Sequence, residues 1–287
     1  MAQLSVFPLA SETVIVIPCY NEADRLPVAS FEAYVALTDR VRFIFVNDGS
    51  TDETSSLLNE LVSRNPKRLE YLDLEENCGK AEAIRRGFLH AIEKDFEVIG
   101  FWDADLSTPL QPIENFRSVL DLHESIEMVV GSRISLLGRD IQRNPVRRAL
   151  GKLFATTASM ALGFRIHDTQ CGAKMFRVTP HLKEVFAEPF SSKWIFDVEL
   201  IARYIQLLNQ SDRQMNFIYE QPLDQWKEID GSRLQSQDFL TAVLDLANIY
   251  WRHLRPGARP YISANRDELI SDSPAAKSNQ ANESRAA

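Results

Sequence analysis

Short runs of β-branched and aromatic residues recur along the first half of the chain and alternate with stretches of helical periodicity. The runs lie at 14–17, 43–46, 69–74, 98–102 and 128–130, and helical patterns lie between them at 51–63 and 80–93. Apolar runs of this length are typical of strands that are buried on both faces. The alternation of strand and helix predicts an α/β fold with a mainly parallel, doubly wound central sheet.

Polar clusters follow directly after three of these predicted strands. They occupy 18–22, 47–50 and 103–105, after the first, second and fourth runs. Ligands of open α/β sheets bind outside the carboxyl ends of the strands. We therefore expect the three clusters to meet at one crevice.

The pattern changes from about residue 133. A basic segment is followed by an uncharged helical stretch at 150–164, a loop that contains cysteine and glycine, and a helical pattern at 196–208. Residues 215–219 predict a further strand, and residues 238–254 predict an amphipathic helix. Residues 256–287 are mostly small and polar, so we expect a disordered tail after a single domain over 1–255.

Composition narrows the possible functions. The chain has 287 residues, of which 45% are hydrophobic and 25% are charged, as in a globular protein with a large core. Its formal net charge of −8 argues against wholesale binding to a nucleic acid. Its three cysteines lack a CxxC pair, which indicates neither a disulfide framework nor a zinc site. Without a secretory signal or a run long enough to span a membrane, we expect a cytoplasmic protein with at most peripheral membrane contact.

Two carboxylates flank one small residue directly after the fourth predicted strand. Asp103 and Asp105 can together hold a hard divalent cation through oxygen ligands, and such a cation neutralises a diphosphate leaving group. A solvated loop is the alternative for an isolated pair of this kind. The segments at 47–52 and 77–83 also have two interpretations: each is a capped helix start, or it places Asp48 or Lys80 beside a nucleotide.

Several motifs occur together in a fixed order and spacing. They are Pro18-x-Tyr20-Asn21-Glu22, Asn47-Asp48-Gly49-Ser50-x-Asp52, Asn77-x-Gly79-Lys80-x-x-Ala83, Asp103-x-Asp105 and Gly131-Ser132-Arg133. This set resembles the family 2 glycosyltransferases, which have the A-type nucleotide-diphospho-sugar transferase fold. Later motifs at 168–174, 194–200 and 226–233 resemble the dolichyl-phosphate β-glucosyltransferase branch, close to the dolichyl-phosphate mannose synthases. The resemblance covers about residues 12–254 and implies a nucleotide-sugar half at 12–132 and an acceptor half at 133–255.

The resemblance implies a donor-binding role for residues of each motif. These residues are Pro18, Tyr20, Glu22, Asp48, Lys80, Asp103, Arg133 and Arg233. The first four would line the nucleoside pocket, and Lys80 would lie near the base. Asp103 and Asp105 would hold Mg²⁺ or Mn²⁺ with the diphosphate, while Arg133 and Arg233 would contact phosphate.

The residues suggest a single displacement at the anomeric carbon that inverts its configuration, because the sequence offers no obvious covalent nucleophile. Asp105 would act through the metal. A hydroxyl acceptor would need a general base, for which Asp168 and Asp197 are the candidates. A phosphate acceptor is already anionic and needs cations in place of a base.

The segment 133–152 contains six basic residues and one acidic residue. This local excess of positive charge favours a phosphorylated acceptor or a membrane surface, with Arg147 and Arg148 as candidate acceptor-binding residues. Residues 150–164 would lie in the bilayer interface or form an ordinary core helix. The expected function is transfer of a hexose, glucose from UDP-glucose, to a polyprenyl or dolichyl monophosphate at the cytoplasmic membrane face. The alternatives are a soluble hydroxyl acceptor and a non-catalytic nucleotide-sugar-binding protein.

Overall fold

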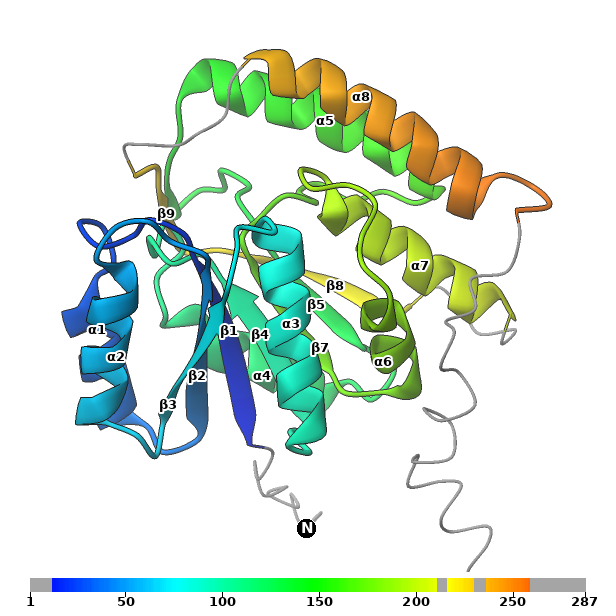
Figure 1. Ribbon diagram of the computed structural model, residues 1–287. Coiled ribbons are helices and arrows are strands. Elements are labelled where there is room, and N and C mark those ends of the chain that lie inside the picture. Colours follow the sequence, from blue (N-terminus) through cyan, green and yellow to red (C-terminus); the bar gives the residue numbers. More distant parts are fainter. Residues whose placement is uncertain (1–11, 211–215, 230–235, 259–287) are drawn as a thin grey trace, which may run out of the picture.

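A seven-stranded sheet forms the centre of the molecule, and helices cover both of its faces (Figure 1). The computed structural model describes residues 12–210, 216–229 and 236–258. The strand order is β3-β2-β1-β4-β7-β5-β8, and β7 is the strand that runs antiparallel to both of its neighbours. A separate pair of short strands, β6 and β9, is parallel.

Strands and helices alternate regularly along the chain before β5 and less regularly after it. The strands are β1 (Thr13–Cys19), β2 (Val41–Asp48), β3 (Leu69–Leu74), β4 (Val98–Trp102), β5 (Met128–Ser132), β6 (Asp140–Gln142), β7 (Ala173–Arg177), β8 (Ile218–Pro222) and β9 (Gln225–Lys227). The helices are α1 (Val28–Leu37), α2 (Thr54–Arg64), α3 (Lys80–Glu93), α4 (Pro112–Leu122), α5 (Pro145–Leu162), α6 (Pro180–Ala187), α7 (Phe196–Gln210) and α8 (Ser236–Ile249), and a π-helical turn, η1 (Tyr250–Leu254), continues α8.

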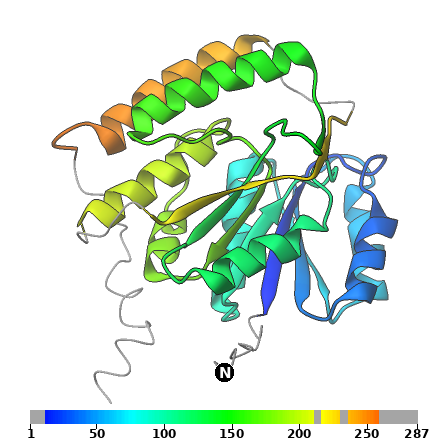
Figure 2. The ribbon, with the colours of Figure 1, turned by 180° about the vertical axis from the view of Figure 1, so that it is seen from behind.

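The two faces of the sheet bury separate sets of apolar side chains, because successive residues of a strand point to opposite faces. Val14 and Val16 of β1 belong to the core that includes α3, α6 and α7. Ile15 and Ile17 belong to the core that includes α1, α2 and α4, on the face seen in Figure 2. The strand is therefore buried on both sides, which explains its uninterrupted apolar sequence.

Local sequence sets both ends of α5, which lies beside α8 above the carboxyl edge of the sheet (Figures 1 and 2). The side chain of Asn144 caps the helix by accepting the backbone N–H of Val146 at 2.9 Å, and Pro145 takes the first helical position. Gly163 ends the helix at φ +79°, a left-handed conformation that favours glycine.

The expected α/β fold with a mainly parallel sheet is confirmed. The predicted runs at 69–74 and 98–102 coincide with β3 and β4, and the helical pattern at 80–93 coincides with α3. The loop predicted after residue 164 instead contains β7 and α6, and the strand expected at 215–219 lies at Ile218–Pro222. Of the expected tail, 259–287 lies outside the described residues.

Candidate active site

The polar clusters that follow β1 and β2 are joined by hydrogen bonds, as their place at one edge of the sheet predicts. The backbone N–H of Asn21 donates to Oγ of Ser50 at 3.0 Å, and Oδ1 of Asn21 accepts the N–H of Thr51 at 2.8 Å. The N–H of Glu22 donates to Oγ1 of Thr54 at 2.7 Å. These bonds fix the two loops as one surface at the carboxyl edge.

Asp48 uses both carboxylate oxygens to hold the loop before α3. Oδ1 accepts the N–H of Cys78 and Oδ2 accepts the N–H of Gly79, each at 2.8 Å, and the side chain is buried. This fixes the loop from which Lys80 begins α3. Pro18 and Tyr20 lie partly buried at the end of β1.

Asp103 and Asp105 follow β4 at the same edge. Asp103 forms an ion pair with Lys80, and its backbone N–H donates to the carbonyl of Gly172 at 3.0 Å. A Cβ at Gly172 would come within 1.7 Å of Oδ2 of Asp103, so only glycine leaves room for this carboxylate. Oδ1 of Asp105 accepts the N–H of Ser107 at 2.9 Å.

The two carboxylates fit a hard divalent cation that keeps other ligands. Both are partly exposed oxygen donors, and the space that a Cβ at Gly172 would fill holds the carboxylate of Asp103 instead. Among the described residues, no group of three or more His, Cys, Asp or Glu side chains is placed to bind a metal. The protein would thus supply two ligands and leave the remaining positions to a substrate diphosphate and water.

Lys80 lies among carboxylates at this edge. Partial burial alone lowers the pKa of its ammonium, but the nearby carboxylates of Asp103, Asp197 and Asp105 raise the pKa above its ordinary value. The ammonium therefore stays charged and neutralises part of the acidic cluster. The structure pairs Lys80 with the first carboxylate of the Asp-x-Asp motif, and a place for Lys80 near the nucleotide base stays a prediction.

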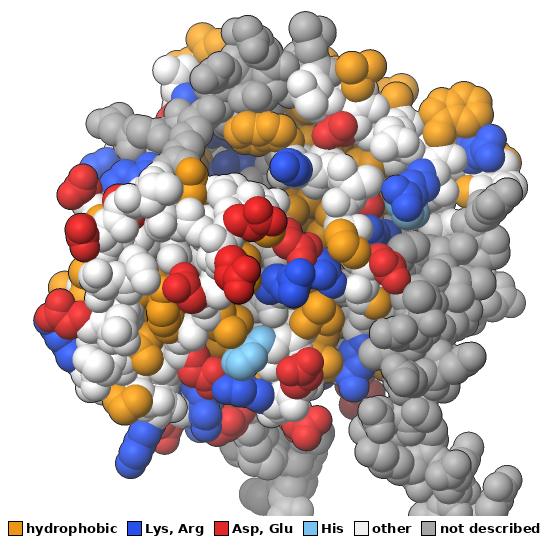
Figure 3. All heavy atoms as spheres, viewed as in Figure 1, with side chains coloured by type: hydrophobic (Ala, Val, Ile, Leu, Met, Phe, Trp, Pro, Cys, Tyr) orange, Lys and Arg blue, Asp and Glu red, His pale blue; other side chains and the backbone are white. Residues whose placement is uncertain are grey.

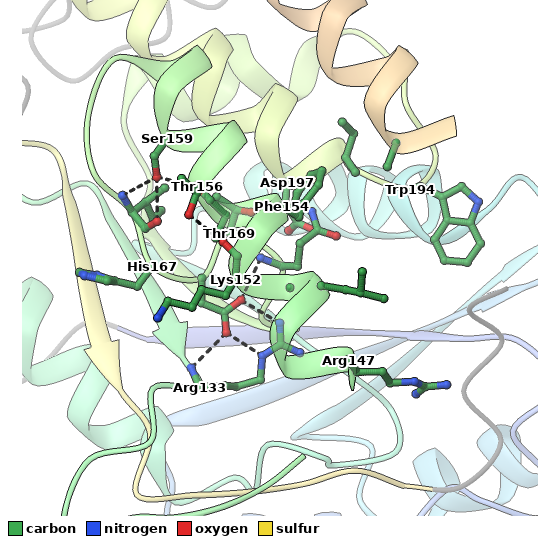
Figure 4. Close-up of a pocket in the computed structure, with 18 of the residues that line it drawn as sticks. Arg133, Arg147, Lys152, Phe154, Thr156, Ser159, His167, Thr169, Trp194 and Asp197 are labelled. Atoms are coloured by element: carbon green, nitrogen blue, oxygen red, sulfur yellow. Dashed lines mark hydrogen bonds and ion pairs between the residues drawn. The ribbon is translucent and has the colours of Figure 1, made fainter. Parts of the chain in front are cut away.

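Asp168 is held by Arg133 in a two-pronged ion pair. Nε of Arg133 lies 2.6 Å from Oδ2 and Nη2 lies 2.8 Å from Oδ1, and the backbone N–H of Arg133 adds a third bond at 3.0 Å (Figure 4). Burial alone raises the pKa of Asp168, but Arg133 lowers it below the ordinary value. The N–H of Gln170 also donates to Oδ1 at 3.2 Å, and a carboxylate with a lowered pKa and four donors is a weak proton acceptor. The guanidinium of Arg133 also lies over the ring of Trp226, 5.3 Å from its centroid.

Asp197 is likewise paired. Nζ of Lys174 lies 2.6 Å from Oδ1 of Asp197 and 2.7 Å from the carbonyl oxygen of Cys171, and the Lys174 side chain is fully buried. Burial raises the pKa of Asp197 even though Lys174 acts to lower it. The pair joins α7 to β7 at the cavity, which Asp197 lines.

Glu220 of β8 is a site residue that the sequence interpretation missed. Its Oε1 accepts the N–H of His167 at 2.8 Å and of Asp168 at 3.0 Å, and its Oε2 lies 2.7 Å from Nδ1 of His167. Glu220 thereby fixes the loop that presents Asp168 to Arg133. Its one sequence signal is an acidic residue directly after a run that predicts a strand.

A cavity of about 1570 Å³ lies between α5, the loop after it and the start of α7. Six of the expected site residues line it: Lys80, Arg133, Arg147, Arg148, Asp168 and Asp197. Phe154, Met160, Phe164, Ile195 and Phe196 make much of the wall apolar. In Figure 3 a hollow lies below α8 with Lys or Arg side chains at its edge. The residues expected to line the nucleoside pocket lie outside this cavity.

The basic segment 133–152 is partly neutralised by carboxylates from distant parts of the chain. Arg133 pairs with Asp168, Arg139 with Asp224, and Arg147 with Glu228. Arg148 is exposed and donates to the carbonyl of Ile141 at 3.4 Å. The segment is therefore not the uniformly positive surface that its charge count indicates. Arg233 lies outside the described residues.

Comparison with known sequences places these features in context. A family model described as glycosyl transferase family 2 matches residues 14–183. A dolichyl-phosphate β-glucosyltransferase of Trichomonas vaginalis is 31% identical, with 83% of this chain and 70% of the relative aligned. A mouse dolichyl-phosphate β-glucosyltransferase is 32% identical, with 77% and 68% aligned.

Solved structures share the fold at low sequence identity. Glucosyl-3-phosphoglycerate synthase of Mycobacterium tuberculosis, solved with uridine diphosphate, matches with a TM-score of 0.58 and 16% identity over 84% of this chain and 80% of that one. TarS of S. aureus matches with a TM-score of 0.53 and 16% identity over 91% and 69%. The fold is the A-type nucleotide-diphospho-sugar transferase fold.

Proposed function

Because the chain belongs to glycosyl transferase family 2, we propose that this glycosyltransferase moves glucose from UDP-glucose to a polyprenyl or dolichyl monophosphate. The relatives that share about 30% of its sequence are named for transfer to dolichyl phosphate. The observation that supports the proposal best is the cavity that Lys80, the ion-pair partner of Asp103, helps to line, because its wall combines Lys and Arg side chains with aromatic and aliphatic ones. A phosphate attached to an isoprenoid chain needs both kinds of surface.

The donor would bind at the carboxyl edge of the sheet. Pro18, Tyr20, Glu22 and Asp48 would surround the nucleoside, and Arg233 would contact the diphosphate. Asp103 and Asp105 would hold Mg²⁺ or Mn²⁺. When bound, this cation would supply the positive charge that stabilises the departing nucleoside diphosphate.

The acceptor phosphate would be the nucleophile. One of its oxygens forms a bond to the anomeric carbon while the bond from that carbon to the donor diphosphate breaks, which inverts the configuration. The phosphate monoester is already anionic at pH 7, so no protein group has to remove a proton. In this proposal Asp168 and Asp197 are not bases: Asp168 orients Arg133, and Asp197 fixes α7 against Lys174.

The acceptor's chain would leave the cavity between α5 and α8 toward a lipid surface. Large apolar side chains are exposed on both helices, among them Leu153 (54%), Met160 (77%) and Leu244 (71%), with Trp251 (62%) in the turn after α8. Such side chains beside Arg148 suit the interface between lipid headgroups and acyl chains. Within the described residues, every helix is too short or too polar to cross a bilayer. Peripheral contact at the cytoplasmic face is thus part of the proposal.

A donor screen followed by a transfer assay tests this function. Thermal unfolding would be measured with UDP-, GDP- and dTDP-sugars, with and without Mn²⁺ or Mg²⁺. The stabilising donor would then be incubated with a short polyprenyl monophosphate and, separately, with the matching polyprenol. We expect a metal-dependent shift with UDP-glucose and transfer to the monophosphate alone. Transfer to the alcohol would contradict the phosphate acceptor, and the absence of a shift with every donor would contradict the donor site.

A further inference from the structure

Three of the cations that line the cavity have a carboxylate partner. Lys80 pairs with Asp103, Arg133 with Asp168, and Arg147 with Glu228. Arg143, which comes two residues before α5, also lines the cavity but has no carboxylate partner among the described residues.

Arg143 makes no hydrogen bond or ion pair with any residue that the structure describes. Its side chain is nevertheless partly buried, whereas the other cavity cations that lack such a partner, Lys152, Arg165 and Lys193, are exposed. A cation in open water needs no protein partner, but burial of a guanidinium without an anion costs free energy. Arg143 is therefore the cation of this wall for which a missing anion matters most.

The position of Arg143 depends on a glycine in α5. A Cβ at Gly151 would lie 2.7 Å from Nη2 of Arg143 and 3.2 Å from its Cζ, so the guanidinium rests against the helix where no side chain stands. The capping side chain of Asn144 satisfies the first N–H groups of the helix. An anion at this place would accordingly meet the guanidinium and not free helix N–H groups.

The electrostatic surroundings of Arg143 also indicate an anion. Burial and the neighbouring charge of Arg133 lower the pKa of Arg143 below its ordinary value. Asp168 and Glu228 act in the opposite direction, but each is already bound to another arginine. Arg133 and Arg143 line the same cavity wall, and two partly buried guanidinium groups in one wall are expected where an anionic ligand binds.

We propose that Arg143 binds the phosphate of the acceptor and holds it beside Arg133 for attack on the donor sugar. This inference rests on the proposed function, and it identifies the residue that recognises the acceptor's charge. The planar guanidinium can donate two parallel hydrogen bonds to phosphate oxygens, which orients the phosphate as well as attracting it. Arg147 suits this role less well than Arg143. It would first have to leave Glu228, and in Figure 4 its side chain extends away from Arg133.

The first test compares Arg143→Gln with Arg64→Gln. Arg64 is an exposed residue at the end of α2, so the control makes the same change in net charge far from the cavity. We expect Arg143→Gln to raise the KM for a short polyprenyl monophosphate by about tenfold or more, with the KM for UDP-glucose and the acceptor-free hydrolysis of the donor unchanged. Equal acceptor KM values for the two variants would overturn the inference.

The second test moves the guanidinium without removing it. Gly151→Ala places a methyl group where the guanidinium rests, while alanine favours the helix more than glycine does. We expect an unchanged or raised thermal midpoint together with a severalfold higher acceptor KM. An unchanged acceptor KM would mean that the position of Arg143 against α5 is not used in binding.

A direct binding measurement separates failure of this inference from failure of the proposed function. Calorimetric titration with glycerol phosphate, a soluble phosphate monoester, needs no donor and no lipid. If the wild type binds it and Arg143→Gln does not, the anion site stands even where transfer to the polyprenyl phosphate is absent. If the wild type transfers to the lipid but both proteins bind the monoester equally, Arg143 is excluded. If the wild type binds neither glycerol phosphate nor the polyprenyl phosphate, the anion site and the proposed function are both contradicted.

Discussion

The carboxyl edge of the sheet, where we propose that the donor binds (the donor edge), and the cavity that we propose for the acceptor adjoin each other, yet they are built by different interactions. At the donor edge, carboxylate, amide and hydroxyl groups of short motifs bind backbone N–H groups, as Asp48 does with Cys78 and Gly79. In the cavity, side chains from distant segments pair with each other, as Arg133 does with Asp168 and Arg147 with Glu228. Backbone contacts fix a loop whatever side chains surround it. Pairs of side chains can exchange a protein partner for a ligand.

This difference implies separate consequences for mutation. A change at the donor edge should lower the rate while leaving the fold intact, because the carboxylates that we propose as metal ligands are partly exposed. A change in the buried pairs behind the cavity should reduce stability first, because it leaves a charge without its partner. Four substitutions test whether the donor edge loses activity and the buried pairs lose stability.

The largest expected effect is that of Asp105→Ala. The substitution removes one of the two carboxylates that would hold the metal, so we expect turnover to fall by about a thousandfold. The thermal midpoint should change little, since Asp105 is partly exposed and contacts the N–H of Ser107 two residues away. Initial rates and thermal unfolding measure the two effects, with the exposed Asp121→Ala on α4 as the matched control. Retained activity would remove Asp105 from the metal site.

Gly172→Ala should disturb the same edge of the sheet by displacing the carboxylate of Asp103. The new Cβ would occupy the place of Oδ2 of Asp103, so the carboxylate must move. A displacement of about 1 Å at a reacting centre can lower the rate by about a hundredfold. Mn²⁺ binding in the presence of UDP should weaken together with the rate. A normal rate with normal Mn²⁺ binding would show that the position of Asp103 is not critical.

Glu199 of α7 is a buried carboxylate of the acceptor half, where we expect mutation to reduce stability. Its Oε2 accepts the N–H groups of Ser191 and Ser192 at 2.8 and 3.1 Å, and its Oε1 lies 2.8 Å from Nη2 of Arg203. Burial alone raises the pKa of Glu199, but His253, Arg203 and these donors lower it to about 2. The carboxylate thus ties α7 to the loop before it and to the turn after α8.

Glu199→Gln should therefore cost stability in a pH-dependent way. The pKa of the carboxyl is lower in the folded protein than its ordinary value of 4.5, so the ionised form favours folding above pH 4.5. Near pH 7 we expect a loss of about 3 kcal/mol in the free energy of unfolding. The difference from wild type should shrink as the pH falls from about 4.5 toward 2. Urea unfolding at several pH values measures this, and a constant difference would contradict the assignment.

The difference between local motifs and pairs of distant side chains also explains which features could be predicted from the sequence. The strands and motifs of the donor half were predicted because apolar periodicity and motif spacing are local properties. The strand β7 was missed, since Lys174 near its start makes Ala173–Arg177 look like part of a loop. Its ammonium is buried only because Asp197, 23 positions later, lies beside it.

The candidate site shows the same limit. Asp168 and Asp197, the candidate bases of the sequence analysis, both line the cavity, and their role stays a prediction. Their partners could not be predicted, because the ion pair between Arg133 and Asp168 joins residues 35 positions apart through the loop that Glu220 holds. The count of basic residues in segment 133–152 likewise predicted Arg147 and Arg148, and not Arg143, as acceptor-binding residues. The contact of Arg143 with Gly151 exists only after α5 has formed.

The smallest expected effect is at Lys80, where the two regions meet. Its ammonium pairs with Asp103 and so competes with a divalent cation for that carboxylate. Lys80→Met should strengthen Mn²⁺ binding in the absence of nucleotide by about fivefold, since a partly exposed ion pair contributes at most about 1 kcal/mol. Lys94→Met is the matched control, because Lys94 forms a comparable ion pair with Glu70 at the other end of α3. Electron paramagnetic resonance of free Mn²⁺ measures the affinity of each variant. Weaker binding in Lys80→Met than in Lys94→Met would mean that the ammonium assists the cation, and the donor edge would then depend on side-chain pairs as much as the cavity does.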